Sequence, residues 1–379
     1  MATRTTTGKP TLRRTVSGEP SLSEAMALAL AVEEREERVT HGFHTYPAGL
    51  HPDAARDLLA LFPGQRVLDP FCGGGTVLVE GLLAGRVVEG RDLGPTALRV
   101  ARARTAVVSD EVLTAVRSAS RSLAAAGRAV RHPAPPGVEQ ALGEWYAPHV
   151  LAELWAIGSA MEAGDGVVRD LLRVVFSSIV VKTSWRASDT QARREEHHRP
   201  PGTASVLFHK KARELARRLV ALRELVPEGT PPASIRAGDA RKLDVEPVDL
   251  ILTSPPYPGV YDYLELQHLR NLWFDDDVPA MDEIGSRRSW REAPREALTQ
   301  WRRDTEAWMT AAAAKLLPGG ALVVVIGDGL TPHGAIDAYS PTHDAAAAVG
   351  LREVARASLE RPDHARDASR WEHVVAFRR

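Results

Sequence analysis

The segment Ser254-Pro255-Pro256-Tyr257 carries the most specific chemistry in this sequence, and it follows an apolar stretch at 250–252. Two consecutive prolines stiffen the backbone, so the Ser254 side chain and the Pro255 carbonyl can offer two hydrogen-bond acceptors in fixed geometry. An exocyclic amine of a nucleobase is a poor nucleophile, because its lone pair is delocalised into the ring. Acceptors for both of its N–H groups favour a localised lone pair. Tyr257 offers a flat face for a base taken out of its stack. The alternative is a polyproline turn with a buried tyrosine.

A glycine-rich loop, Asp69-Pro70-Phe71-Cys72-Gly73-Gly74-Gly75-Thr76, lies between a predicted strand at 66–68 and a predicted helix at 77–83. Glycine lets the backbone approach a bound nucleoside closely in this position. A phosphate-binding loop would continue with Lys-Ser or Lys-Thr, whereas this chain has Thr76-Val77. The loop therefore predicts a nucleoside cofactor rather than a nucleoside triphosphate.

Two further aspartates are expected at the ends of strands. Asp92 ends the second predicted strand, where a carboxylate can accept hydrogen bonds from both hydroxyls of a ribose. The alternative for Asp92 is an N-cap of the helix expected from Thr96. Asp239, in Gly238-Asp239-Ala240, ends the third predicted strand, although Gly-Asp is also a common turn.

Taken in order, the glycine loop and the Ser-Pro-Pro-Tyr segment resemble those of the amino-methyltransferases of DNA and RNA, over residues 43–108 and 234–377. The resemblance implies S-adenosyl-L-methionine as cofactor and a class I methyltransferase fold. It also implies cofactor-binding roles for Tyr46, Asp69, Phe71, Gly73, Gly75, Thr76, Asp92 and Asp239, and catalytic roles for Ser254, Pro255, Pro256 and Tyr257.

Within this resemblance, the roles follow the parts of the cofactor. The loop wraps the methionine part and Asp69 helps to hold its charged end. The Asp92 carboxylate accepts from the ribose, and that of Asp239 contacts the adenine amino group. Phe71 either faces the adenine ring or packs under the loop. Tyr46 lies in the segment 43–48, which closes over the methionine end.

The same resemblance indicates the substrate. Serine as the first member of the tetrapeptide is commoner in enzymes that act on cytosine N4, whereas Asp or Asn is commoner in those that act on adenine N6 or guanine N2. Methylation of cytosine C5 would need a catalytic cysteine, but the single cysteine, Cys72, lies in the glycine loop. We therefore expect a DNA methyltransferase acting on cytosine N4.

Other functions stay open. Adenine N6 is the first alternative, and an RNA enzyme of the tRNA guanine-N2 type is the second. Such RNA enzymes usually carry an N-terminal RNA-binding domain, for which the 42 residues before Phe43 leave no room. A non-catalytic binding module would be signalled by an altered tetrapeptide, and this one is intact. A paired restriction endonuclease and the oligomeric state are not indicated by the sequence.

Strands alternating with helices predict a Rossmann-like, doubly wound parallel sheet that positions these residues. We expect strands at 66–68, 86–90, 234–237, 250–253, 321–326 and 371–377. The expected division is a flexible tail and helix at 1–40, a cofactor half at 41–110, a helical insertion at 111–229 and a catalytic half at 230–379. The helix of the first part is expected from Ser21, as N-cap, to Arg38.

The insertion is the expected nucleic-acid-binding region. Between Lys182 and Arg218 it holds ten Lys or Arg against four Asp or Glu, in a chain with a net charge of −1. Such a patch can face phosphates, although a charge run is also common on a solvated helix face. Trp185, at its start, either stacks on bases or belongs to the core.

Metal binding, membrane insertion and disulfide formation are not expected. His44 and His51 have no Cys or carboxylate at ligand spacing, so we expect structural or cofactor-adjacent histidines and no metal. A single cysteine cannot form an intramolecular disulfide, and no apolar run approaches the ~20 residues that span a membrane. We expect a soluble, cytoplasmic protein.

Overall fold

One sheet of eight strands organises the structure, a computed structural model that describes residues 13–32, 38–47, 49–276, 283–331, 334–363 and 368–379. Across the sheet the strands are β1 (Arg14–Gly18), β11 (Arg352–Asp363), β12 (Ala368–Arg378), β8 (Leu316–Gly327), β7 (Val248–Thr253), β2 (Arg66–Asp69), β3 (Val87–Asp92) and β6 (Ser234–Ala237). Strands β6, β3, β2, β7 and β8 run parallel, whereas β12, β11 and β1 are joined by antiparallel pairs. The predicted Rossmann-like fold is confirmed, with an antiparallel edge.

Alternation of side chains along the strands gives the sheet its two apolar faces. In β7, Leu250 and Leu252 pack on one face with α1 (Pro20–Leu30), α2 (Pro52–Leu61) and α3 (Thr76–Leu83). Ile251, between them, packs on the other face with Trp308 of α12 (Pro294–Lys315), and α13 (Tyr339–Ala348) lies on that face as well. Helices on both faces leave the carboxyl ends of the parallel strands as the edge where a ligand can bind.

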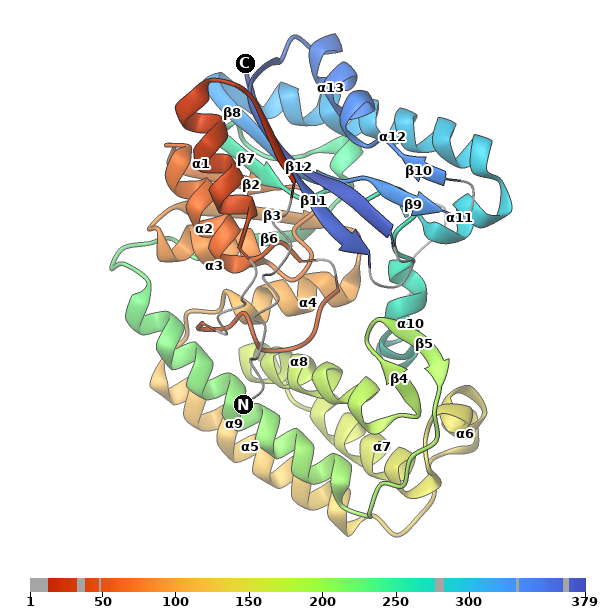
Figure 1. Ribbon diagram of the computed structural model, residues 1–379. Helices are drawn as coiled ribbons and strands as arrows, with labels where there is room; N and C mark the ends of the chain where they lie inside the picture. Colours follow the sequence, from red (N-terminus) through yellow and green to blue (C-terminus); the bar gives the residue numbers. More distant parts are fainter. Residues whose placement is uncertain (1–12, 33–37, 48, 277–282, 332–333, 364–367) are drawn as a thin grey trace, which may run out of the picture.

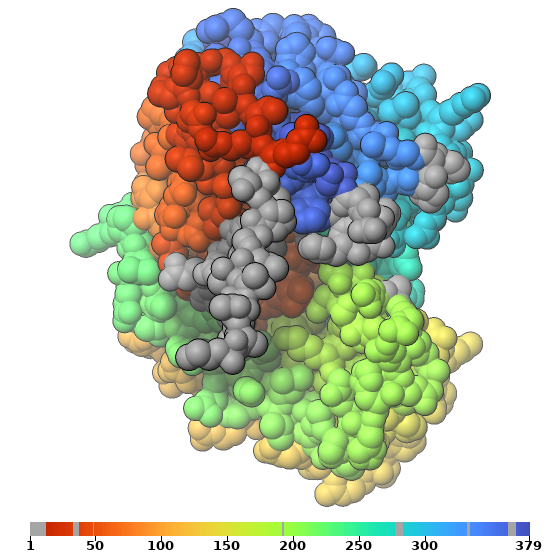
Figure 2. Space-filling view, in the orientation of Figure 1, coloured from red at the N-terminus to blue at the C-terminus, as the bar shows by residue number. Residues whose placement is uncertain are grey.

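Residues 110–225 form a second, mainly helical core below the sheet (Figures 1 and 2). Its helices α5 (Asp110–Ala129) and α9 (Thr203–Leu225) lie side by side. The others are α6 (Pro136–Leu142), α7 (Pro148–Glu162) and α8 (Gly166–Thr183), with a short 3₁₀ turn at Gly143–Trp145. The sequence predicted helices here but not the hairpin of β4 (Arg186–Ser188) and β5 (Gln191–Arg194), which has no alternating apolar pattern.

The connection from the sheet to this second core is made by α4 (Pro95–Arg104) on one side and α10 (Tyr263–Phe274) on the other. Both helices contact α8. The remaining elements are a 3₁₀ turn at Ala240–Lys242, α11 (Arg287–Glu292) and the strand pair β9 (Gly329–Thr331) and β10 (Gly334–Ile336). No helix among the described residues combines the length and apolarity that crossing a bilayer requires.

The amino-terminal prediction is wrong in two respects. Residues 14–18, expected within a flexible tail, form edge strand β1, and the helix starts at Pro20 with Glu19, not Ser21, as its N-cap. Every residue of β1 is exposed, so backbone pairing with β11 holds it there without any apolar signal in the sequence. The helix ends at Leu30, and residues 1–12 and 33–37 lie outside the described part of the chain.

A buried arginine ties the segment before the glycine loop to the loop itself. Arg104, at the end of α4, is only 6% exposed and donates to the carbonyl oxygens of Phe43 at 3.0 Å, His44 at 2.6 Å and Gly74 at 3.0 Å. A guanidinium has only donors, so backbone carbonyl oxygens are suitable partners for it. This contact sets the position of segment 43–47 over the loop.

We predict that Arg104→Met lowers the free energy of unfolding by about 1–3 kcal/mol for each carbonyl left buried without a donor. The matched control is Arg102→Met on the same helix, because Arg102 is exposed and donates to the carbonyl of Ile235 instead. Denaturant unfolding of the two variants measures the difference. Equal losses in both would contradict a special role for Arg104.

Candidate active site

A cavity opens at the carboxyl ends of β2, β3, β6 and β7, where the sequence predicted a ligand site. Its wall brings together most of the predicted residues: Tyr46, Asp69, Phe71, Gly73, Thr76, Asp92, Asp239, Ser254 and Pro256. The other predicted residues, Gly75, Pro255 and Tyr257, lie beside these but are not in the wall. Segments separated by up to about 200 residues of sequence therefore meet at one edge of the sheet, as the parallel topology requires.

The glycine loop needs its glycines for conformation and for space. Gly73 and Gly75 have φ angles of 47° and 80°, and Gly75 is the N-cap of α3. A Cβ atom on Gly74 would lie 2.7 Å from Nη1 of Arg104. The loop can therefore bend between β2 and α3 and leave its inner backbone open to the cavity.

Asp92 holds the loop and faces the cavity at the same time. Its Oδ2 accepts from the backbone N–H of Gly73 at 2.9 Å, and its Oδ1 accepts from that of Gly94 at 2.8 Å. The N-cap of α4 is Gly94, so the alternative in which Asp92 caps this helix is wrong. Burial raises the pKa of Asp92 above its usual value, and hydrogen bonds from backbone N–H groups oppose this shift. Lone pairs on both oxygens stay available for a further donor.

A hydrogen bond joins the glycine loop to the Ser-Pro-Pro-Tyr segment. Thr253 Oγ1 donates to Asp69 Oδ1 at 2.7 Å, and the backbone N–H of Phe71 donates to the same oxygen at 3.2 Å. Thr253 ends β7 and Asp69 ends the adjacent β2. Burial raises the pKa of Asp69 to about 7 despite these two donors. Asp69 therefore fixes the distance between the two segments and titrates near neutral pH.

The Ser-Pro-Pro-Tyr segment is part of a chain of hydroxyl contacts. The Tyr257 hydroxyl donates to Glu372 Oε1 of β12 at 2.9 Å, and the Ser254 side chain lies close enough to the phenol to oppose the rise of its pKa. Burial raises the pKa of Tyr257 well above its usual value. The ring packs against Gly327, where a Cβ atom would come within 2.5 Å of it. Tyr257 thus has a polar role that sequence reasoning did not assign, and base stacking on its ring stays a prediction.

Two other predicted residues have partners of their own. The Asp239 carboxylate accepts from Arg241 Nε at 2.9 Å and 3.0 Å, and Arg241 also donates to Asp304. These contacts lower the pKa of Asp239, although burial opposes them. Phe71 lies edge-on to Trp308 at 5.6 Å between ring centroids while it lines the cavity. A contact from either residue to an adenine stays a prediction.

The histidines have structural partners. His44 Nε2 lies 2.9 Å from Ser177 Oγ of α8, and His51 caps α2 by accepting from the backbone N–H of Asp53 at 3.1 Å. Burial lowers the pKa of His44 well below its usual value, so the ring is neutral at pH 7. In the part of the chain that the structure describes, no three His, Cys, Asp or Glu side chains form a group suited to a metal ion.

Sequence reasoning missed one wall of the cavity. It is formed by Tyr263, Gln267 and Asn271 of α10 and by Glu283, which follows it in the chain. The three helical residues are spaced i, i+4 and i+8, so they share one face of α10. This spacing was the only signal in the sequence, and it is equally typical of a face packed in a core.

The basic patch of the insertion is partly neutralised by its own acidic residues. Arg193 pairs with Glu195, and Arg194 pairs with Glu196 at 2.7 Å. The guanidinium of Arg194 also lies over the Trp185 ring, 4.7 Å from its centroid. The hairpin arginines are therefore weaker phosphate ligands than their number indicates, and Trp185 stacks within the protein.

Residues 40–134 match a family model described as an RMKL-like methyltransferase domain. The chain therefore contains a methyltransferase domain, and the predicted cofactor, S-adenosylmethionine, is confirmed. Among curated proteins, the type II methyltransferase M.MvaI of Kocuria varians is 35% identical over 81 residues, which are 20% of this chain and 18% of that protein.

Solved structures resemble the chain at low TM-scores. TrmN from Thermus thermophilus has a TM-score of 0.36 and 16% identity, covering 88% of this chain and 50% of TrmN. The rRNA methyltransferase aviRa from Streptomyces viridochromogenes has a TM-score of 0.33 and 15% identity, covering 93% of this chain and 92% of aviRa. The chain thus spans half the length of TrmN and less than a fifth of M.MvaI.

We predict that Asp92→Ala weakens S-adenosylmethionine binding by about 1–3 kcal/mol, because an acceptor and the support for Gly73 are lost together. Asp92→Asn keeps one acceptor oxygen and should lose less. Calorimetric titration of both variants measures the affinity, and circular dichroism checks the fold. Unchanged affinity in Asp92→Ala would remove this carboxylate from the site.

We also predict that cofactor affinity depends on pH through Asp69. S-adenosylmethionine carries a sulfonium and an amino group, and their positive charges favour the ionised carboxylate. Because the free protein protonates Asp69 below about pH 7, binding there releases a proton, and affinity should rise between about pH 6 and 8.

Titration calorimetry in two buffers of different ionisation enthalpy measures this proton release. Asp69→Asn, which cannot ionise, should flatten the pH dependence. Glu283 lies in the same cavity, and burial raises its pKa to about 7 as well. A pH dependence that survives intact in Asp69→Asn would therefore assign the proton to Glu283.

Proposed function

We propose that this chain is a DNA methyltransferase that transfers the methyl group of S-adenosylmethionine to an exocyclic amino nitrogen, cytosine N4 being the favoured target. The observation that carries the proposal is the series of polar side chains Ser254, Tyr257 and Glu372 at the edge of the cofactor cavity, in which Tyr257 donates to Glu372. Ser254 and Tyr257 belong to the segment whose residue types suit methylation of an amine. The hydrogen bond from Thr253 to Asp69 connects this segment to the glycine loop.

The series explains why Ser254 would act as an acceptor. The Tyr257 hydroxyl donates a hydrogen bond to Glu372, so its oxygen can accept a hydrogen bond from the nearby Ser254 hydroxyl. The lone pairs of Ser254 Oγ then point away from that proton and can accept an N–H from the amine. Glu372 is itself held by Arg361, whose Nε donates to its other oxygen at 2.9 Å. Ser254 is thus oriented without acting as a nucleophile.

The residues of the cavity fit the cofactor. Glycine backbone borders the space, and the carboxylates of Asp69, Asp92 and Asp239 suit a ligand with a ribose, an amino group and a sulfonium. S-adenosylmethionine supplies an electrophilic methyl group when it is bound. Ser254 and Pro255 would hold the amine of the base by accepting its N–H groups.

The choice of polymer and base rests on weaker observations. The partial match to a type II methyltransferase supports DNA, and serine at position 254 supports cytosine N4 over adenine N6 or guanine N2. The insertion would bind the duplex, and a restriction endonuclease would be the corresponding partner. RNA methylation is the second candidate, since the tetrapeptide and the glycine loop serve amines in both polymers.

We predict that Ser254→Ala lowers turnover about tenfold to a hundredfold while cofactor affinity stays unchanged, because one acceptor for the amine is lost. Tyr257→Phe should also lower turnover, since it removes the oxygen that can accept from the Ser254 hydroxyl. The matched control is Tyr339→Phe, which loses a comparable bond to Glu353, at 2.9 Å, from a helix that does not line the cavity.

The assay is transfer of a labelled methyl group to unmethylated genomic DNA and to total RNA in parallel, followed by mass spectrometry of the nucleosides. We expect label in N4-methylcytosine from DNA. Full activity of Ser254→Ala would exclude the mechanism, and label in RNA alone would exclude DNA as the substrate.

A further inference from the structure

Four buried polar atoms on the cavity wall have no hydrogen-bond partner among the described residues. They are Thr96 Oγ1, Gln267 Nε2, Asn271 Oδ1 and Glu283 Oε2. Burying a polar atom without a partner is costly, so native proteins usually leave such atoms unpaired only where water or a ligand completes them. Gln267 is the clearest case, because its residue is only 6% exposed and its amide borders the cavity.

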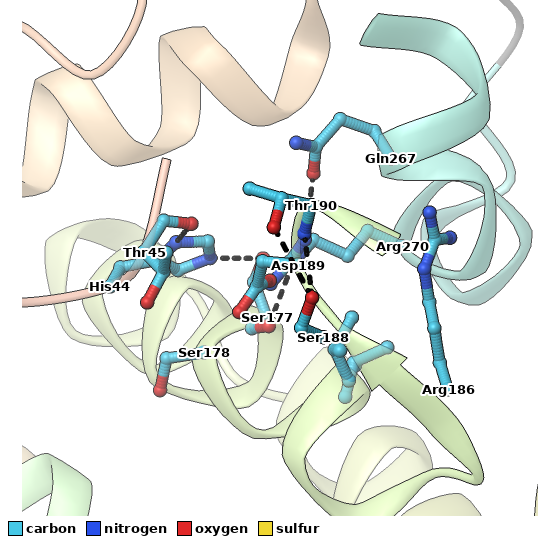
Figure 3. Close-up of polar contacts among 12 residues, drawn as sticks. His44, Thr45, Ser177, Ser178, Arg186, Ser188, Asp189, Thr190, Gln267 and Arg270 are labelled. Atoms are coloured by element: carbon cyan, nitrogen blue, oxygen red, sulfur yellow. Dashed lines mark hydrogen bonds and ion pairs between the residues drawn. The ribbon is translucent and has the colours of Figure 1, made fainter. Parts of the chain in front are cut away.

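The orientation of the Gln267 amide is fixed by Arg270. Arg270 Nη1 donates to Gln267 Oε1 at 2.8 Å, as Figure 3 shows. A guanidinium cannot accept a hydrogen bond, so the amide oxygen must face Arg270 and the amide nitrogen must face away from it. The end of the Gln267 amide that is left for a ligand is therefore the donor, Nε2, which has no partner among the described residues.

Arg270 is held in turn by the helical insertion. It is 1% exposed, its Nε donates to the backbone carbonyl of Ser177 at 3.1 Å, and it pairs with Asp189 between β4 and β5 (Figure 3). Ser177 also contacts His44 of the segment that precedes the glycine loop. The insertion thus sets the direction of the Gln267 amide through Arg270.

We propose that Gln267 Nε2 donates to the ring nitrogen beside the exocyclic amine of the target base, which is N3 of cytosine or N1 of adenine. This rests on the proposed function. Ser254 and Pro256 line the same cavity, and the helix that carries Gln267 begins six residues after Tyr257. Other residues are predicted to bind the ribose, the adenine and the charged end of the cofactor, whereas none has been assigned to the ring nitrogen of the base.

A fixed donor at this position discriminates between orientations of the base. Cytosine and adenine each have an unprotonated ring nitrogen next to the amino group, so this nitrogen can accept a hydrogen bond from the Gln267 N–H. Guanine flanks its N2 amine with a protonated N1 on one side and an unprotonated N3 on the other, so only the orientation with N3 toward Gln267 pairs the donor. Leaving buried donors unpaired rejects a ligand far more strongly than a small difference in size does. Gln267 therefore selects a base orientation that places an unprotonated ring nitrogen on its side of the amine.

The test uses Gln267→Glu in the full chain. A glutamate oxygen can still accept from Arg270, so the fold should persist, but the donor facing the cavity is lost. We expect methyl transfer to DNA to fall about tenfold, through KM for DNA or through kcat, with the affinity for S-adenosylmethionine within about twofold of wild type. The matched control is Gln65→Glu at the opposite end of β2, where Nε2 donates to the carbonyl of Gly85.

A substrate analogue gives a second, independent readout. Duplexes that contain the methylated sequence are compared with duplexes in which the target base lacks the ring nitrogen, as 3-deazacytosine or 1-deazaadenine. Wild type should lose about tenfold more activity on the analogue than Gln267→Glu does, because the variant has no donor to lose.

The outcomes are distinct. Equal losses on the analogue by both proteins, or full activity of Gln267→Glu on the natural base, would overturn the role of Gln267 while the methyltransferase function stands. A large loss of S-adenosylmethionine affinity in the variant would assign the donor to the cofactor instead. Absence of label on any base with wild-type protein would overturn the proposed function, and the role of Gln267 with it.

Discussion

The cofactor cavity depends on a single buried guanidinium. Arg104 binds the carbonyls of Phe43 and His44 on one side and that of Gly74 on the other, so it holds the preceding segment against the glycine loop. Without this contact, Tyr46 would have no fixed position over Gly73, with which it is in close contact. Because the guanidinium is buried and multiply bonded, the contact is directional and leaves little freedom to the loop. The rest of the site is assembled around this fixed segment.

Hydrogen bonds between strand ends then connect the parts that perform different tasks. The bond from Thr253 to Asp69 sets the distance between the reactive segment and the cofactor loop, and Glu372 of the antiparallel strand β12 orients Tyr257. From the other side, the insertion reaches the cavity through Arg270 and Gln267. The insertion is therefore part of the active-site wall, and its influence on the substrate does not depend on the charge of its surface.

Local sequence patterns were sufficient for the parallel part of the fold. Strands β2 and β7 and the second half of β8 are apolar runs followed by polar residues, and this pattern is typical of strands that are buried on both faces of a sheet. The same patterns did not predict strands that are held mainly by backbone hydrogen bonds to a neighbouring strand. Strand β1 is wholly exposed, β11 carries charged residues along its length, and the β4–β5 hairpin follows a helix without apolar alternation. Such strands depend on a neighbouring edge, which the local sequence does not specify.

Within the candidate site, the glycine loop and the Ser254 segment could be predicted from the sequence because each is a contiguous pattern, and Asp92 could be predicted from its place at the end of a strand. Which donors and acceptors lie at the cavity depends on tertiary packing. Arg104, Gln267 and Arg270 are ordinary helical residues in the sequence, and their partners lie 30 to 93 positions away, except for the Gln267–Arg270 pair within α10. The donor and the acceptor of such a buried hydrogen bond come from two separate elements. Their relative orientation is therefore set by how these elements pack and cannot be predicted from either local sequence.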